Sequence, residues 1–181
     1  MRKTLEVVDD FHPNPAALMG RALDEPDRTA VEIAAPGRGR YVGPCYVDPW
    51  AAAAVSSLLG ATVEGIVAPP FAGRFALRDK DVPGDDVPHR GPTDWTAVIF
   101  LSSAPPPQAG LTFLRQSSGA LEDWVECAFI PLRFNRMVLY RSSVLGYRAS
   151  PGFGSGLADG WLSHEWRFGL VLPPERGAHA H

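Results

Sequence analysis

Residues 88–115 read PHRGPTDWTAVIFLSSAPPPQAGLTFLR, and the pattern of apolar residues and turns in this segment is typical of a β-sheet core. Its near-continuous apolar run, Trp95–Leu101, predicts a strand that is buried on both faces. A proline-rich turn follows, and Leu111–Arg115 predicts a second strand that returns along the first. His89 precedes the buried strand beside a tight Arg90-Gly91-Pro92 bend. We therefore expect a β-sheet core with one imidazole at the mouth of a central strand.

Short apolar segments on both sides of this stretch predict the other strands. Gly and Pro each occur 18 times in the chain, which suits many short strands joined by tight turns better than a helical bundle. Residues 31–44 are expected to be extended or loop. We expect further strands at Leu5–Val8, Val63–Val67, Gly73–Leu77, Trp124–Ile130, Arg136–Tyr140, Val144–Tyr147 and Trp161–Leu172.

Two helices are predicted near the N-terminus. Asn14-Pro15 reads as an N-cap followed by proline in the first turn, and apolar residues continue this helix through residue 23. Asp48-Pro49 repeats the signal, and Gly60 marks the end of a second helix over residues 50–59.

Together these elements predict a single domain over residues 1–181, of the α+β class and mainly β. A chain of 181 residues can bury one sizeable core, and its 45% hydrophobic and 20% charged residues are typical of a globular protein. The strand order favours a double-stranded β-helix (a cupin-like jelly roll) with the two N-terminal helices packed outside. Residues 173–181 are expected to form a flexible tail.

The charge and hydropathy of the chain argue against several classes of partner. The formal net charge is −3, so no strongly basic surface is available for nucleic acid or anionic lipid. No apolar run approaches the roughly 20 residues of a membrane helix, and the N-terminus lacks an apolar signal core. We therefore expect a cytoplasmic protein whose partner is a small molecule, not nucleic acid or a membrane. The oligomeric state is left open, with a homodimer as one option.

Several short motifs, taken in order, carry a resemblance to a known family. VVDDFHPNP near the N-terminus is followed by PHRGPTDWTAVIFLS, GLTFLR, NRMVLYRSSVLGYR, PGFG and DGWL. In this combination the chain resembles a branch of bacterial proteins with the jelly-roll fold of iron- and 2-oxoglutarate-dependent oxygenases. The likeness runs from Val7 to about Phe168. It implies the double-stranded β-helix and a site at the open end of the roll.

In such oxygenases a His-x-Asp pair and a distal His hold iron, and an Arg on the last strand anchors 2-oxoglutarate. The resemblance places the first His on His89, the carboxylate on Gly91, the distal His on Tyr147 and the Arg on Trp161. Of these positions, only His89 keeps the side chain that the chemistry needs. We therefore expect neither a metal nor another cofactor at this site.

Two other residues are candidates to rebuild a metal site. Asp94 is more simply interpreted as a cap of the turn before Trp95. On the last strand, alternation turns only one of His164 and Glu165 inward, and a core or surface histidine is the simpler interpretation of His164.

The remaining polar residues favour a binding or acid–base site. We expect His89 and Tyr147 to be its acid–base or polarising pair. Each arginine taken singly is also explained as a charge at the rim, and no phosphate loop, serine nucleophile elbow or Cys–His dyad is present. Four further residues are expected to bind the substrate, with the tryptophans as walls: Trp95, Arg115, Arg141 and Trp161.

The leading hypothesis is a repurposed enzyme that needs neither metal nor 2-oxoglutarate. It would cyclise, rearrange or isomerise a small, largely apolar organic molecule of specialised metabolism through shape and hydrogen bonds. A non-catalytic pseudo-oxygenase that binds a ligand is the first alternative. The second alternative is an iron-dependent oxygenase with atypical ligands such as Asp94 or His164.

Overall fold

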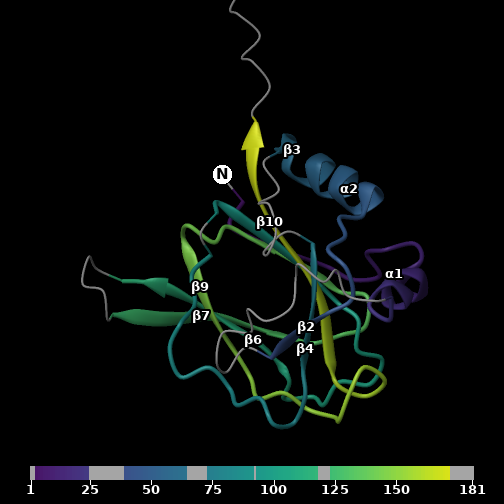
Figure 1. Ribbon diagram of the computed structural model, residues 1–181. Helices are drawn as coiled ribbons and strands as arrows, with labels where there is room; N and C mark the ends of the chain where they lie inside the picture. The colour runs from purple at the N-terminus through teal and green to yellow at the C-terminus, as the bar shows by residue number, and fades with distance from the viewer. Residues whose placement is uncertain (1–2, 25–38, 65–72, 92, 118–122, 172–181) are drawn as a thin grey trace, which may run out of the picture.

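Two antiparallel sheets face each other, and both helices pack outside the larger sheet (Figure 1). The computed structural model describes residues 3–24, 39–64, 73–91, 93–117 and 123–171. In chain order the elements are β1 (Leu5–Val8), α1 (Pro15–Arg21), β2 (Arg40–Val42), α2 (Pro49–Leu59), β3 (Thr62–Glu64), β4 (Arg74–Arg78), β5 (Trp95–Phe100), β6 (Gly110–Gln116), β7 (Trp124–Pro131), β8 (Met137–Tyr140), β9 (Leu145–Ala149) and β10 (Trp161–Val171).

Strand β10 lies at the centre of the larger sheet. The order of that sheet is β1-β8-β5-β10-β4-β2, with β3 also paired to β10, and the smaller sheet is β7-β6-β9. One edge of β10 pairs with β4, where Trp161 lies opposite Arg78, and the other edge pairs with β5, where Phe168 lies opposite Trp95. The mainly β architecture with two outer helices that the sequence predicts is confirmed.

Both helices begin where the sequence predicts them. Asn14 and Asp48 each accept a hydrogen bond from the backbone amide three residues later, at 3.1 and 2.9 Å, which satisfies a donor that the first turn leaves open. Gly60 ends α2 in the left-handed region, at a φ of 63°. Ala51 and Val55 of α2 are fully buried and pack with the core of the larger sheet.

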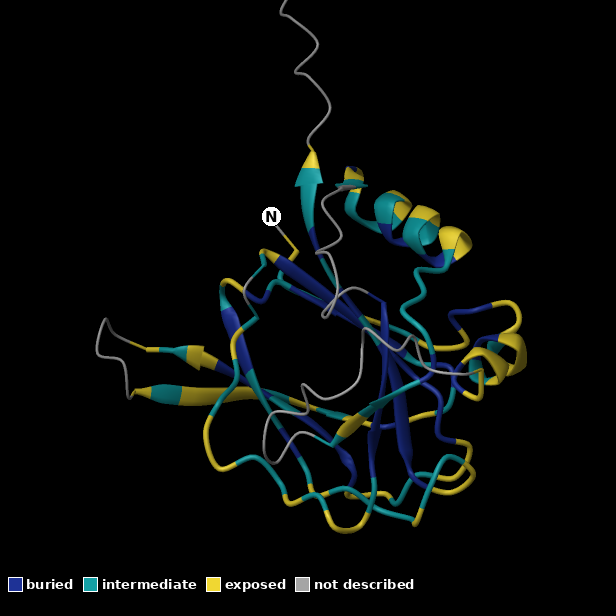
Figure 2. Ribbon diagram, viewed as in Figure 1, coloured by how far each residue is buried: buried dark blue, intermediate teal, exposed yellow. Residues whose placement is uncertain are grey.

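Strand β10 separates two layers of side chains, because successive residues of a strand point to opposite faces. Leu162, Trp166 and Phe168 belong to the core beneath the helices. The alternate residues, from Trp161 to Arg167, face the space between the two sheets. Figure 2 shows that the strands around this space are largely buried while the outer turns are exposed.

Most strands match the sequence-based expectation, and β2 is the main difference. All six residues of β5 are buried, as its apolar run predicts. Strand β2 lies within residues expected to be extended or loop, and its pairing with the edge of β4 accounts for its strand conformation. Residues 65–67 of one expected strand and the expected tail at 173–181 lie outside the described residues. Neither described helix is long and apolar enough to cross a membrane.

Candidate functional site

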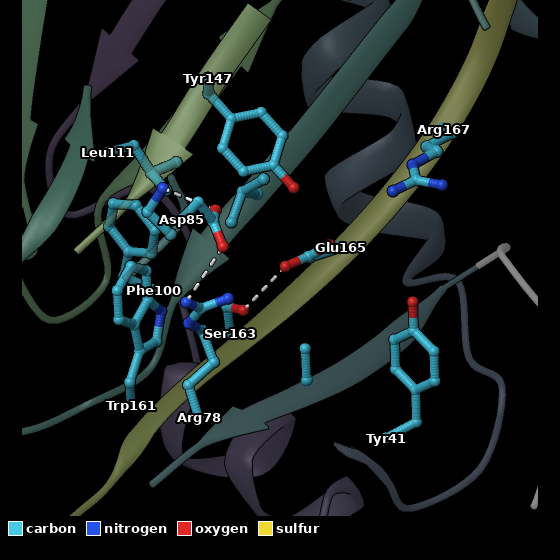
Figure 3. Close-up of a pocket in the computed structure, with 13 residues that line it drawn as sticks. Tyr41, Arg78, Asp85, Phe100, Leu111, Tyr147, Trp161, Ser163, Glu165 and Arg167 are labelled. Atoms are coloured by element: carbon cyan, nitrogen blue, oxygen red, sulfur yellow. Dashed lines mark hydrogen bonds and ion pairs between the residues drawn. The ribbon is translucent and has the colours of Figure 1, made fainter. Parts of the chain in front are cut away.

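A cavity lies between the two sheets, and residues of both sheets form its wall. About 40 Å³ of it is open to the centre of a water molecule. Roughly 10–15 Å³ of such space holds one water, so the cavity has room for a few waters or a small ligand. The lining residues are Tyr41, Ala76, Arg78, Asp85, Val98, Phe100, Leu111, Tyr147, Ala149, Trp161, Ser163, Glu165 and Arg167 (Figure 3).

Asp85 is the carboxylate at one side of the cavity, and its side chain is only 4% exposed. Its Oδ1 lies 3.4 Å from Nη2 of Arg78, and its Oδ2 lies 3.3 Å from Nε2 of His89. The amide of Ala149 donates a further hydrogen bond to Oδ2 at 2.8 Å. Burial works to raise the pKa of Asp85, but these three partners hold it below its usual value. Asp85 is therefore ionised at neutral pH.

His89 lies at the rim of the cavity, where Asp85 separates its side chain from the interior. Its amide donates to the carbonyl of Tyr147 at 2.8 Å, and its carbonyl accepts from the amide of Tyr147 at 3.0 Å. The two rings meet edge to face, with centroids 5.7 Å apart. The His89 side chain is 17% exposed and is not among the residues that line the cavity. His89 therefore links the buried carboxylate to solvent.

Trp161 and Arg78 close one end of the cavity. The Arg78 guanidinium lies over the Trp161 ring, 5.4 Å from its centroid, because the two residues are directly opposite on β4 and β10. Nη2 of Arg78 donates to the carbonyl of Pro83 at 2.8 Å as well as reaching Asp85. Nε of Arg78 is buried without a hydrogen-bond partner.

The end of the cavity opposite to Trp161 and Arg78 is lined by ionisable side chains of β10 and by tyrosines. Ser163 donates to Glu165 at 3.1 Å. Burial works to lower the pKa of Arg167, but nearby Glu165 and tyrosines keep it raised. Tyr140 is fully enclosed beside this group, and burial raises its pKa well above the usual value. Glu165 and Arg167 are thus a carboxylate and a guanidinium held in a partly dehydrated space.

The structure brings some of the expected site residues together. Tyr147 and Trp161 line the same cavity, and His89 reaches it through Asp85. Leu145, expected to share the inward face of its strand with Tyr147, belongs to the core cluster between the sheets.

Three expected substrate-binding residues do not reach the cavity. Trp95 lies in the core beneath the helices, on the face of β5 opposite to Val98. Arg115 is exposed, two residues beyond buried Phe113 on β6. Arg141 follows β8, where its amide donates to the carbonyl of Thr4, and it does not line the cavity.

Four important lining residues escaped the sequence-based prediction. Glu165 and Arg167 share the inward face of β10 with Trp161, so alternation from Trp161 would have found them. Arg78 would have required knowledge of the pairing between β4 and β10. Asp85 lies in a loop with other acidic residues, and no local signal distinguishes it from Asp86.

The described residues do not fit the iron site that the resemblance implies. A Cβ at Gly91 would lie 2.9 Å from Cβ of Ser142, so that position has no room for a carboxylate without a shift. His164 lies on the helix-facing side of β10, with Nε2 at 2.7 Å from the carbonyl of Tyr46. Asp94 is exposed. Within the described ranges, no three His, Cys, Asp or Glu side chains are grouped to hold a metal ion.

Comparison with solved structures identifies the fold. A Pseudomonas putida prolyl-4-hydroxylase matches with a TM-score of 0.50 and 18% identity, over 91% of this chain and 86% of that one. The Fe(II)/α-ketoglutarate-dependent dioxygenase TqaL matches with a TM-score of 0.36 and 13% identity, over 59% of this chain and 42% of its own. No family model and no curated protein sequence matches. The chain therefore has the double-stranded β-helix fold of the 2-oxoglutarate-dependent oxygenases.

Proposed function

We propose that this protein is an enzyme that uses the cavity of an oxygenase-type jelly roll for proton transfer. In this proposal it rearranges, cyclises or isomerises a small molecule and needs neither iron nor 2-oxoglutarate. The observation that carries the proposal is the Asp85 carboxylate, which lines the cavity and lies 3.3 Å from Nε2 of His89. A buried carboxylate coupled to an imidazole at the rim is suited to moving a proton between a ligand and solvent.

The roles follow from where the groups lie. Asp85 and Tyr147 would contact the ligand, the first as a proton acceptor and the second as a hydrogen-bond donor. His89 would position Asp85 and exchange protons with water, because its side chain is partly exposed. An isomerisation of this kind removes one proton from the ligand and returns one elsewhere, so it balances without an oxidant or reductant.

The lining also narrows the choice of ligand. About half of the lining side chains are polar or charged, and the charged ones are two arginines and two carboxylates. These groups favour a ligand with polar ends over the largely apolar one that the sequence suggests, because an apolar ligand would displace water from charged side chains without replacing its hydrogen bonds. The apolar side chains Phe100 and Leu111 leave part of the wall for a small hydrocarbon group.

The side chains that could bind iron support a reaction that needs no metal. His89 is the one iron-ligand position that keeps its side chain, and its Nε2 already faces Asp85. Of the atypical ligands considered above, Asp94 is exposed, and His164 lies on the helix-facing side of β10 with its Nε2 at the carbonyl of Tyr46. A single imidazole is a weak site for iron. The cytoplasmic location stays a prediction from the sequence.

The test uses the exchange of ligand hydrogen with solvent. Small polar metabolites with an acidic C–H bond are incubated with the protein in D₂O, and deuterium in the ligand is measured by mass spectrometry. We expect exchange that persists in EDTA and is lost in Asp85→Asn. Asp86→Asn is the matched control, because the same change is made at an exposed neighbour. Exchange that disappears with EDTA and returns with ferrous iron would contradict the proposal and favour an iron-dependent oxygenase.

A non-catalytic binding protein is the second candidate. The observation in its favour is that Asp85 has three partners, which also suits a structural role joining its loop to β9. This candidate expects a ligand to raise the melting temperature without any exchange of hydrogen. Thermal shift and deuterium uptake, measured on the same samples, separate the two functions.

A further inference from the structure

Arg78 brings hydrogen-bond donors that are not fully used to the wall of the cavity. A guanidinium has five N–H groups, and every hydrogen bond that Arg78 makes to the described residues runs through Nη2. This atom lies 2.8 Å from the carbonyl of Pro83, 3.5 Å from that of Ser150 and 3.4 Å from Oδ1 of Asp85. Nε is buried without a partner, and Figure 3 shows the guanidinium pointing from β4 into the cavity. Nη1 is therefore left to donate to a ligand oxygen.

The charges of the side chains that line the cavity offset each other. Asp85 lies 3.4 Å from Nη2 of Arg78, and the negative charge of Glu165 offsets that of Arg167 from the same face of β10. An anionic or cationic ligand would add an uncompensated charge to a partly dehydrated space, which is costly. The cavity therefore suits an uncharged ligand with an oxygen that accepts a hydrogen bond.

Arg78 also lies beside the carboxylate that acts as the base in the proposed function. A carboxylate is a weak base, so Asp85 can take a proton only from a C–H bond that a neighbouring carbonyl group makes acidic. Negative charge then develops on the carbonyl oxygen, and a positive group aimed at that oxygen stabilises it. The Nη1 side of Arg78 supplies such a group next to the base. The Arg78 and Asp85 pair therefore suits the removal of a proton beside a carbonyl group.

The rest of the lining fits a short molecule with a second polar group. Ser163 donates to Oε1 of Glu165 at 3.1 Å, and a ligand hydroxyl, which both donates and accepts, can join this pair without adding charge. Val98, Phe100 and Leu111 form an apolar wall for a short carbon chain. The space of about 40 Å³ that is open to water centres limits the ligand to roughly three to five non-hydrogen atoms.

We propose that the cavity binds a small, uncharged carbonyl compound, a short hydroxyketone or hydroxyaldehyde, with its carbonyl oxygen at Nη1 of Arg78. Asp85 takes a proton from the hydroxyl-bearing carbon, the electron pair of that bond forms a C=C bond, and the carbonyl pair moves to its oxygen. The hydroxyl proton passes to this oxygen, and Asp85 returns its proton to the former carbonyl carbon. The step balances without an oxidant or reductant. This inference rests on the proposed function, because it names the substrate class of the same site.

The first test compares three probes of similar size with the unmodified protein in an NMR titration that follows the probe signals. Hydroxyacetone is uncharged, glycolate carries a negative charge and ethanolamine carries a positive one. We expect hydroxyacetone to bind about tenfold or more tightly than either of the others, because each of them brings an uncompensated charge. Equal or tighter binding of glycolate or ethanolamine, or no binding of hydroxyacetone, would overturn the inference.

A substitution of Arg78 then tests where the carbonyl oxygen lies. Arg78→Gln should slow the deuterium exchange of hydroxyacetone at its hydroxyl-bearing carbon about a hundredfold or more, because the developing oxyanion loses its positive partner. The same variant should shift the binding preference toward ethanolamine, because Asp85 is no longer offset. Arg115→Gln, at an exposed position of β6, is the matched control and should change neither property. Unchanged exchange and preference in Arg78→Gln would show that the assignment is wrong; the probe series decides the ligand class even if this variant does not fold.

The two proposals fail in different ways. Tighter binding of hydroxyacetone than of both charged probes, but no deuterium exchange in any ligand, would retain this ligand class and contradict the enzyme. Exchange in a charged ligand that depends on Asp85, together with equal binding of hydroxyacetone and glycolate, would retain the enzyme and contradict this inference.

Discussion

The buried imidazole of His164 should make the stability of the protein depend on pH. His164 is fully buried on the helix-facing side of β10, stacked on Phe75 with ring centroids 4.5 Å apart. Burial lowers its pKa from 6.5 to about 4, although the hydrogen bond to the carbonyl of Tyr46 opposes this. The folded protein therefore keeps His164 neutral at pH values where the unfolded chain protonates it.

The size and sign of the effect follow from this difference. Because the unfolded state binds the extra proton, the free energy of unfolding falls as the pH is lowered from about 6.5 to about 4. One pKa unit corresponds to about 1.4 kcal/mol, so His164 should account for a loss of about 3 kcal/mol by pH 4. The aspartates with lowered pKa, including Asp48 and Asp85, lose their contributions mainly at lower pH, since their folded values lie below 3.8.

Urea unfolding at pH 7 and pH 4, followed by tryptophan fluorescence, measures this loss. The comparison is with His164→Gln, whose amide can still donate to the Tyr46 carbonyl but does not titrate in this range. We expect the unmodified protein to lose about 3 kcal/mol more than the variant over this interval. Equal losses in the two proteins would contradict this prediction, because they would mean that burial does not hold His164 neutral.

Three further variants probe the cavity and its rim. Gly91→Ala should lower stability by about 1–3 kcal/mol, because its Cβ would crowd Ser142; an unchanged urea midpoint would contradict that contact. The double variant Gly91→Asp, Tyr147→His introduces two expected iron ligands, the first of which requires a shift of Ser142, and it should bind ferrous iron more tightly in a metal titration. Binding no better than that of the parent would mean that the correspondence with the oxygenase site is wrong. Trp161→Ala should cost about 3–5 kcal/mol in urea unfolding and leave a space that indole partly refills, raising the melting temperature; no response to indole would show that the site collapses around Arg78.

The accuracy of the sequence-based prediction depended on how local each signal was. Asn14 and Asp48 predict the helix starts because a cap acts on an amide only three residues away. Strand β2 could not be predicted, because its conformation depends on pairing with β4 and its own three residues carry little pattern. The long apolar run of β5 predicts burial correctly, but a strand buried on both faces does not reveal which residues face the cavity. Trp95 was therefore expected in the wall of the cavity, whereas it packs on the opposite face of β5, in the core beneath the helices.

The candidate site was predicted only in part, for a similar reason. Tyr147 and Trp161 were found because the resemblance assigns their positions, and both line the cavity. Asp85 and Arg78 come from segments that are distant in sequence from β9 and β10, and only the folded sheets bring them together. The expected role of Arg115 assumed that a strand end reaches the cavity, whereas its side chain is exposed.

The central position of β10 also has a consequence for the order in which the chain acquires structure during synthesis. Among the described strands, β10 alone joins the group β1-β8-β5 to the pair β4-β2. Until residues 161–171 have left the ribosome, β4 and β5 each present an unpaired edge, and such edges promote wrong association between chains. The nascent protein thus depends on its last described strand to close the sheet, and a ribosome that pauses shortly before Trp161 would leave it in its most aggregation-prone form.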